Sequence, residues 1–147
     1  KTNHKIIAQI IEYAPDGDLT KTSVFSDELK KYSWNLSFKN TPAAYLTGYL
    51  LGKKAGNKFE EVILDKGSNT LKKDSFIYYV IKGAKDAGLN VRSGEIEISE
   101  DRLFGKHIAS IYENRNGNQF SKLGERVKDI KKELDNALEK INQYGKE

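Results

Sequence analysis

The first part of the chain has a pattern of apolar and polar residues that predicts two strands. Both faces of the segment Lys5–Ala14 are mostly apolar, so we expect it to form a central strand of a sheet. Residues 15–18 (PDGD) have the composition of a turn, because proline presets φ and glycine accepts a positive φ. Leu19–Phe25 is rich in Thr, Val and Phe and predicts a second strand. Together the two strands predict a β-hairpin.

A long apolar segment with helix-end signals follows the hairpin. Asn40 or Thr41 supplies an N-cap, Pro42 suits the first helical position, and Gly56 suits the C-terminal end. We therefore expect a helix that runs to about Ala55. The small residues on its inward face predict close packing against a sheet.

A strand and a second helix come next along the chain. The segment 61–65 (EVILD) predicts a short buried strand, and Asp74 or Ser75 caps an amphipathic helix that ends at Gly88. Strand, helix, strand and helix in this order predict a right-handed crossover and at least one parallel strand pair. Combined with the antiparallel hairpin, this predicts an α/β fold with a mixed β-sheet packed by helices.

The last third of the chain is predicted to be helical. A third helix is expected over Asp101–Tyr112, and residues 114–118 (NRNGN) interrupt it. From Phe120 to Tyr144, apolar residues recur at spacings of three and four on an otherwise charged helix, which is a heptad seam. We divide the chain into a domain of residues 1–113 and an amphipathic C-terminal helical extension of residues 114–147. The seam must dock either on this domain or on a neighbour.

Composition excludes several classes of site. The 147 residues are 37% hydrophobic and 31% charged, which suits one globular domain. The absence of cysteine excludes disulfides, thiolate zinc sites and cysteine nucleophiles, and two histidines argue against a multi-histidine metal site. The sequence contains no apolar run long enough to span a bilayer and no signal peptide, so we expect no membrane partner.

Positive charge is concentrated in the first two thirds of the chain. Residues 1–92 carry 15 Lys/Arg against 10 Asp/Glu, whereas residues 93–147 carry 10 against 11, and the net charge is +4. Lysines make up most of the basic residues, and a lysine acts towards phosphate as a point charge rather than as a forked base reader. A basic front half favours a polyanionic partner.

Three features that resemble catalytic or nucleotide sites have simpler interpretations. Gly48–Lys53 resembles a phosphate loop, but its spacing is wrong and it lies inside the predicted helix, so core packing is favoured. Asp65 ends a strand, where α/β enzymes often place a carboxylate, but no second acidic residue or histidine is predicted beside it. Neither His4 nor His107 is paired with a nucleophile.

Two polar segments have the composition of an RNA contact surface. The first is Lys1–Lys5, just before a strand, and the second is the lysine-bearing loop of residues 66–73 after another strand. Small polar side chains, free backbone N–H groups and lysines suit phosphates and 2′-hydroxyls. On the residues alone, three alternatives remain open: RNA binding, a small α/β enzyme that uses Asp65, and a protein-interaction module that uses the seam of residues 120–144.

Several sequence blocks occur in the order found in a known family. The blocks NTPAAYLTGYLLG (residues 40–52), VILDKGSN (62–69) and YVIKGAKDAGLNV (79–91) resemble the universal large-subunit ribosomal protein family eighteen. The resemblance is to its archaeal and eukaryotic-type branch, whose members carry 5S ribosomal RNA. It covers Thr2–Tyr112 and includes TNHKIIAQI at residues 2–10.

The resemblance implies a three-layer α/β domain without catalytic activity, cofactor or metal. It implies binding to 5S rRNA and to large-subunit rRNA in the central protuberance, beside neighbouring large-subunit proteins, on cytoplasmic ribosomes. Family members usually carry an arginine-rich N-terminal arm and a first strand before the position of Thr2, so we expect both to be missing here. An apolar residue is usual where this chain has Lys66. The RNA-facing residues that the resemblance implies are Thr2, Asn3, His4, Lys5, Lys66, Ser68 and Asn69, and we add Lys72 and Lys73 on charge.

Overall fold

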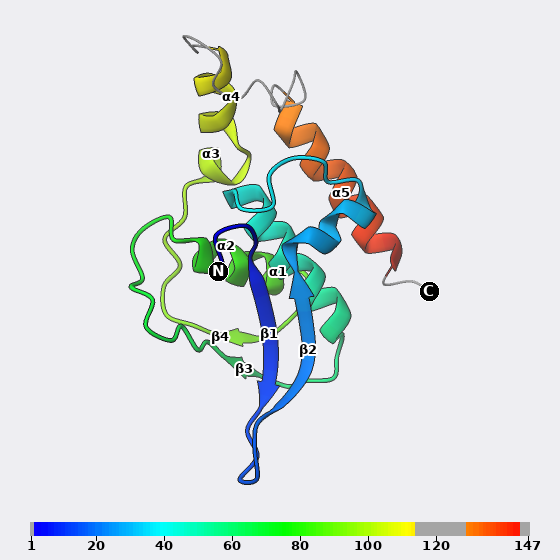
Figure 1. Ribbon diagram of the computed structural model, residues 1–147, viewed down its shortest axis with the longest axis vertical. Coiled ribbons are helices and arrows are strands. Elements are labelled where there is room, and N and C mark those ends of the chain that lie inside the picture. Colours follow the sequence, from blue (N-terminus) through cyan, green and yellow to red (C-terminus); the bar gives the residue numbers. More distant parts are fainter. Residues whose placement is uncertain (1, 114–128, 145–147) are drawn as a thin grey trace.

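The computed structural model describes residues 2–113 and 129–144, and its elements follow the predicted order (Figure 1). The structure combines many helices with short strands and has a helix near its C-terminal end, which confirms the predicted α/β class with a C-terminal helix. The elements are β1 (Ile7–Glu12), β2 (Leu19–Phe25), the 3₁₀ helix η1 (Ser26–Tyr32), α1 (Thr41–Ala55), β3 (Val62–Ile63), α2 (Phe76–Asp86), β4 (Val91–Arg92), α3 (Glu100–Leu103), α4 (Lys106–Glu113) and α5 (Ile130–Tyr144).

Strands β1 and β2 form the predicted antiparallel hairpin. A backbone hydrogen bond from Gly17 to Ala14 (3.0 Å) closes the turn, and Gly17 has a φ of 133° that only glycine readily adopts. Among the described residues β1 pairs only with β2, so it does not hold the predicted central position. Its second face is apolar in composition but lies open, and Ile11 is 52% exposed.

Strands β3 and β4 form a parallel pair with α2 as the connection between them, so the prediction of at least one parallel pair is confirmed, although no strand was predicted at residues 91–92. Strand β3 is shorter than the predicted segment 61–65, and Ile63 is 73% exposed, so the prediction of a buried strand is wrong.

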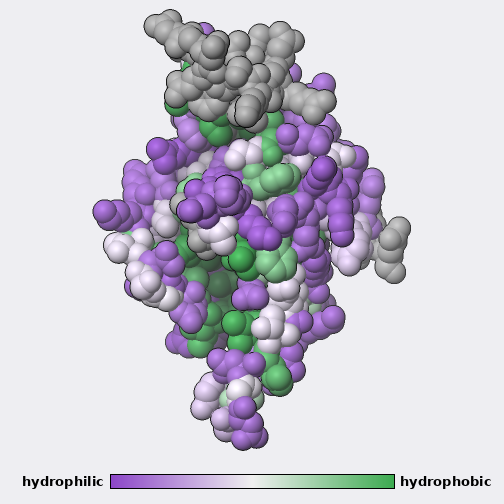
Figure 2. All heavy atoms as spheres, viewed as in Figure 1, coloured by the Kyte–Doolittle hydropathy of each residue, from purple (hydrophilic) through white to green (hydrophobic). Residues whose placement is uncertain are grey.

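In the described part of the chain the four strands make two separate two-stranded sheets instead of one mixed sheet. A groove of about 1250 Å³ lies between them, lined by β1, β3 and α2. Figure 2 shows hydrophobic side chains gathered around this hollow.

Helix α1 is the centre of the core and has the predicted ends. The Asn40 side chain accepts a hydrogen bond from the backbone N–H of Ala43 (2.9 Å), and Gly56 follows the last turn with a φ of 55°. Nearly every residue of α1 is buried. Its glycines pack against helix α2, where a Cβ on Gly48 would lie 1.9 Å from the carbonyl oxygen of Val80. Helix α1 also contacts the sheet of β1 and β2, as predicted.

Asp74 fixes the position of the loop before α2. Asp74 or Ser75 was predicted to cap α2, and Ser75 holds the N-cap position, although its side chain makes no capping hydrogen bond. The carboxylate of Asp74 accepts hydrogen bonds from the hydroxyl of Tyr79 (2.6 Å) and the backbone N–H of Ser99 (2.7 Å). The hydrogen bond from Tyr79 holds the pKa of the Asp74 carboxyl below its ordinary value, so the carboxylate is the form that binds. This links the end of the 66–73 loop to the segment that precedes α3.

The helix predicted over Asp101–Tyr112 is broken in two. Gly105 separates α3 from α4 with a φ of 69°, and a Cβ there would lie 2.7 Å from a side-chain carbon of Ile130. The apolar spacing continues through the break, so the sequence pattern could not reveal it. Packing of α5 against this turn explains why glycine is needed there.

Helix α5 docks on this domain, which settles the alternative that the heptad seam left open. Its buried face packs against α1 and η1, and the hydroxyl of Tyr49 donates to the side-chain oxygen of Asn142 (2.7 Å). Lys140 donates to the hydroxyl of Ser33, and the rings of Tyr32 and Tyr144 meet edge to face. The earlier seam residues, the interruption at residues 114–118 and the proposed boundary between 113 and 114 lie outside the described residues. The buried residues of α5 are Ile130, Leu134, Ala137 and Ile141.

Candidate nucleic-acid interface

The turn before β1 is held by the hydroxyl of Thr2. This oxygen accepts hydrogen bonds from the backbone N–H groups of His4 (3.3 Å) and Lys5 (3.0 Å), and the backbone N–H of Thr2 donates to the carbonyl of Lys5 (2.8 Å). Thr2 therefore shapes the turn. The side chains of Asn3 and His4 are exposed and remain available to a partner.

Two lysines lie at this turn, and their ammonium groups have different partners. Lys5 pairs with Asp27 (3.2 Å) and its ammonium lies 4.6 Å from the centre of the Phe25 ring, so part of its charge is already compensated. Lys39 donates to the backbone carbonyl of Asn3 (3.0 Å) and adds a cation that sequence reasoning missed. It is 36 residues from Asn3 along the chain, and nothing in the sequence signals their contact.

The loop after β3 is ordered by its own hydrogen bonds. The carboxylate of Asp65 accepts from the backbone N–H of Gly67 (2.8 Å), and the side-chain amide of Asn69 donates to the carbonyl of Lys66 (2.8 Å). The ammonium of Lys66 donates to the carbonyl of Asn69 (3.2 Å). These contacts fix the backbone while leaving Ser68 exposed. The side-chain N–H group of Asn69 is used within the loop, whereas its side-chain oxygen accepts no hydrogen bond from the residues that the structure describes.

Uncompensated positive charge gathers in this loop. Lys66, Lys72 and Lys73 are all exposed, and in the part of the chain that the structure describes no carboxylate lies within 4.0 Å of any of their ammonium groups. None of these ammonium groups is therefore held in an ion pair, although the charge of Lys73 also acts on the neighbouring Asp74 carboxylate. Because Asp74 anchors the end of the loop, Lys72 and Lys73 are presented from a defined backbone.

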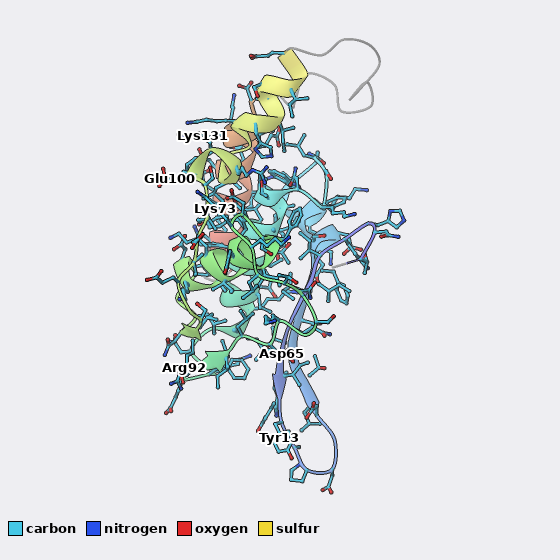
Figure 3. All side chains as sticks on the ribbon, turned by 90° about the vertical axis from the view of Figure 1, so that its left-hand side faces the viewer. Tyr13, Asp65, Lys73, Arg92, Glu100 and Lys131 are labelled. Atoms are coloured by element: carbon cyan, nitrogen blue, oxygen red, sulfur yellow. The ribbon has the colours of Figure 1, made fainter. Side chains whose placement is uncertain are left out.

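The predicted residues form two patches. Figure 3 shows Asp65 and Lys73 on the side that faces the viewer, while the turn before β1 lies at the right-hand edge of the view. The described residues of the two segments share no hydrogen bond or ion pair. An extended polyanion such as RNA can contact both patches, whereas a small ligand would contact only one.

The geometry gives no support to the enzyme alternative. Asp65 caps the loop, and its carboxylate makes no contact with a histidine or another carboxylate among the described residues. His107 is half-buried on α4, where burial lowers the pKa of its imidazole. Gly48–Lys53 lies within α1, as expected. No cluster of His, Asp and Glu in the described ranges has the geometry of a metal site.

Comparison with known proteins shows which family the chain belongs to. The family described as "Ribosomal large subunit proteins 60S L5, and 50S L18" matches residues 1–75. "Large ribosomal subunit protein uL18" of Sulfurisphaera tokodaii is 43% identical over 98% of this chain and 80% of the relative. The chain belongs to this family. The uL18 proteins of Saccharolobus solfataricus (39% identical, 98% of this chain, 78% of the relative) and Korarchaeum cryptofilum (41%, 97%, 78%) are similar over the same extent.

Membership of the uL18 family confirms the resemblance found in the sequence blocks, including its archaeal character. It makes the chain a structural protein of the large ribosomal subunit. As a separate observation, none of the helices within residues 2–113 and 129–144 combines the length and apolarity that crossing a membrane requires.

Proposed function

We propose that this ribosomal protein binds 5S rRNA and attaches it to the large-subunit rRNA in the central protuberance. In this function it is a binding protein without catalytic activity, and it works on cytoplasmic ribosomes beside other large-subunit proteins. The observation that carries the proposal is the exposed, uncompensated lysine loop of residues 66–73 in a member of the uL18 family. The domain of residues 1–113 would supply the RNA contacts, and the extension of residues 114–147 would support it.

The loop has the features that an RNA backbone requires. Each lysine that reaches a phosphate releases condensed counterions, which favours binding and makes it sensitive to salt. The hydroxyl of Ser68 and the free side-chain oxygen of Asn69 suit 2′-hydroxyls, which both donate and accept. Because the loop is already ordered by Asp65 and Asn69, little conformational entropy is lost when RNA binds.

The turn before β1 forms the second part of the proposed surface. Asn3 and His4 are exposed donors and acceptors, and Lys39 lies close enough to bond the Asn3 carbonyl. Thr2 would act by holding the turn. Lys5 would contribute less than the loop lysines, because Asp27 already pairs with it.

Neutralising the loop lysines is expected to weaken binding to 5S rRNA strongly. The combined variant Lys66→Gln, Lys72→Gln and Lys73→Gln should bind about a hundredfold more weakly near 0.15 M salt. The slope of log K against log salt should become shallower by about one unit for each phosphate that the variant no longer neutralises. Filter binding or fluorescence anisotropy over a range of salt concentrations measures both quantities.

The matched control removes the same charge elsewhere. Lys30→Gln, Lys31→Gln and Lys132→Gln change three exposed lysines on η1 and α5. We expect this control to retain most of the affinity and nearly the original salt slope. Equal weakening in the two triple variants would show that only net charge matters and that the loop is not the site.

A further inference from the structure

The end of the β1–β2 hairpin projects from the body of the protein and presents apolar side chains. Figure 1 shows this hairpin extending below the rest of the fold. Tyr13 is 81% exposed and Leu19 is 52% exposed, and residues 15–21 are exposed throughout. Scattered apolar residues are ordinary on a surface, but a large aromatic residue and a leucine together on a projecting element suit a contact.

The hairpin end is acidic, although the protein as a whole is basic. Glu12 and Lys21 neutralise each other through an ion pair of 2.6 Å. Asp16 and Asp18 are exposed, and neither takes part in an ion pair among the described residues. The hairpin end therefore carries about two negative charges on a chain whose net charge is +4.

The turn is also held in a defined shape. Pro15 restricts the backbone at its start, and Gly17 closes it by donating to the carbonyl of Ala14 (3.0 Å). A turn of this kind presents Tyr13 and Leu19 with little conformational entropy left to lose on binding. Rigid aromatic anchors at the end of an ordered element are typical of the residues that dominate protein–protein interfaces.

We propose that the hairpin end, residues 13–19, docks on a positively charged protein surface with an apolar pocket for Tyr13. The exposed carboxylates at residues 16 and 18 determine the class of partner, because they repel the phosphates of RNA and attract lysines and arginines. Within a large ribosomal subunit this partner is a neighbouring basic protein. The inference rests on ribosomal family membership and specifies one of the protein contacts of the proposed function.

The direct test places a photocrosslinker at the hairpin end of the full chain. p-Benzoylphenylalanine replaces Tyr13, the variant is assembled into large subunits, and the irradiated particles are analysed for crosslinked protein and RNA. A crosslink to a protein segment of net positive charge is expected. A crosslink to rRNA, a crosslink to an acidic segment, or no crosslink in fully assembled subunits would each overturn the proposal.

A second measurement uses substitutions in the same full chain. Tyr13→Ala, and separately Asp16→Lys with Asp18→Lys, should each reduce binding to large subunits stripped of this protein about tenfold. Ile111→Ala, which truncates an exposed apolar side chain on α4, is the control. Binding of the free variants to 5S rRNA should not weaken, which separates this proposal from the proposed RNA function. Undiminished binding to the stripped subunits, or weaker binding to 5S rRNA alone, would contradict it.

Discussion

Gly83→Ala is expected to lower the free energy of unfolding by about 3 kcal/mol. A Cβ on Gly83 would lie 2.0 Å from the carbonyl oxygen of Tyr45 and 2.8 Å from the backbone nitrogen of Tyr49. Both obstacles belong to the backbone of α1, so rotation of a side chain cannot relieve them. Helices α1 and α2 would have to separate, which opens voids throughout the core that they share.

Chemical denaturation with a matched control measures this effect. Gly94→Ala adds the same methyl group where no atom lies within 4 Å and where the backbone does not have a positive φ. We expect its unfolding free energy to change by no more than about 0.5 kcal/mol. If Gly83→Ala were as stable as Gly94→Ala, the close contact between α1 and α2 would be contradicted.

Leu134→Ala is expected to destabilise the protein by about 3 kcal/mol. Leu134 is fully buried where α5 meets the rest of the core, so truncation removes apolar packing and leaves a cavity. Asn136→Ala, at an exposed position of the same helix, controls for the change of helix propensity and should be nearly neutral. Denaturant titration of both variants measures the difference.

This result bears directly on the role of α5. An unchanged stability in Leu134→Ala would mean that α5 does not dock on the domain and that its apolar seam is free for a neighbour. The structure predicts that Leu134→Ala is destabilised. For the same reason, a deletion of residues 120–147 would uncover the core, so it is not a suitable way to separate RNA binding from protein interaction. Point substitutions at exposed positions are the appropriate tests of function.

Local signals in the sequence predicted many of the elements correctly. The cap at Asn40, proline at position 42 and glycine at position 56 act within a few residues of chain, so the ends of α1 follow from local chemistry. The PDGD turn likewise determines the hairpin. The order of strands and helices was sufficient to predict that a parallel pair exists, but not that β4 supplies its second strand.

Features that depend on distant contacts were not predicted. The small residues of α1 signalled a close approach to a sheet, which α1 makes with β1 and β2, but only the fold shows that its glycines also pack against α2. The break at Gly105 depends on Ile130, which lies 25 residues later in the sequence. Apolar residues in β1 and β3 predict burial, yet Ile11 and Ile63 are exposed.

In the candidate site, too, local features were predicted from the sequence and features that depend on distant contacts were not. Residue types alone were enough to select the 66–73 loop, because lysines with small polar neighbours suit phosphate and ribose. They could not show that Lys5 is paired with Asp27, that Thr2 holds the turn, or that Lys39 lies beside Asn3. Those facts depend on residues brought together by the fold. Because of them, we expect the loop to contribute more to RNA binding than the turn before β1.

The most direct test of the central claim is a competition between RNAs for the full chain. 5S rRNA is compared with an unrelated structured RNA of equal length, at about 0.15 M salt where non-specific phosphate contacts are weakened. We predict that the chain prefers 5S rRNA by at least about a hundredfold, since recognition of a folded RNA adds to its electrostatic attraction. Equal affinity for the two RNAs would contradict the account and reduce the loop to a non-specific basic surface.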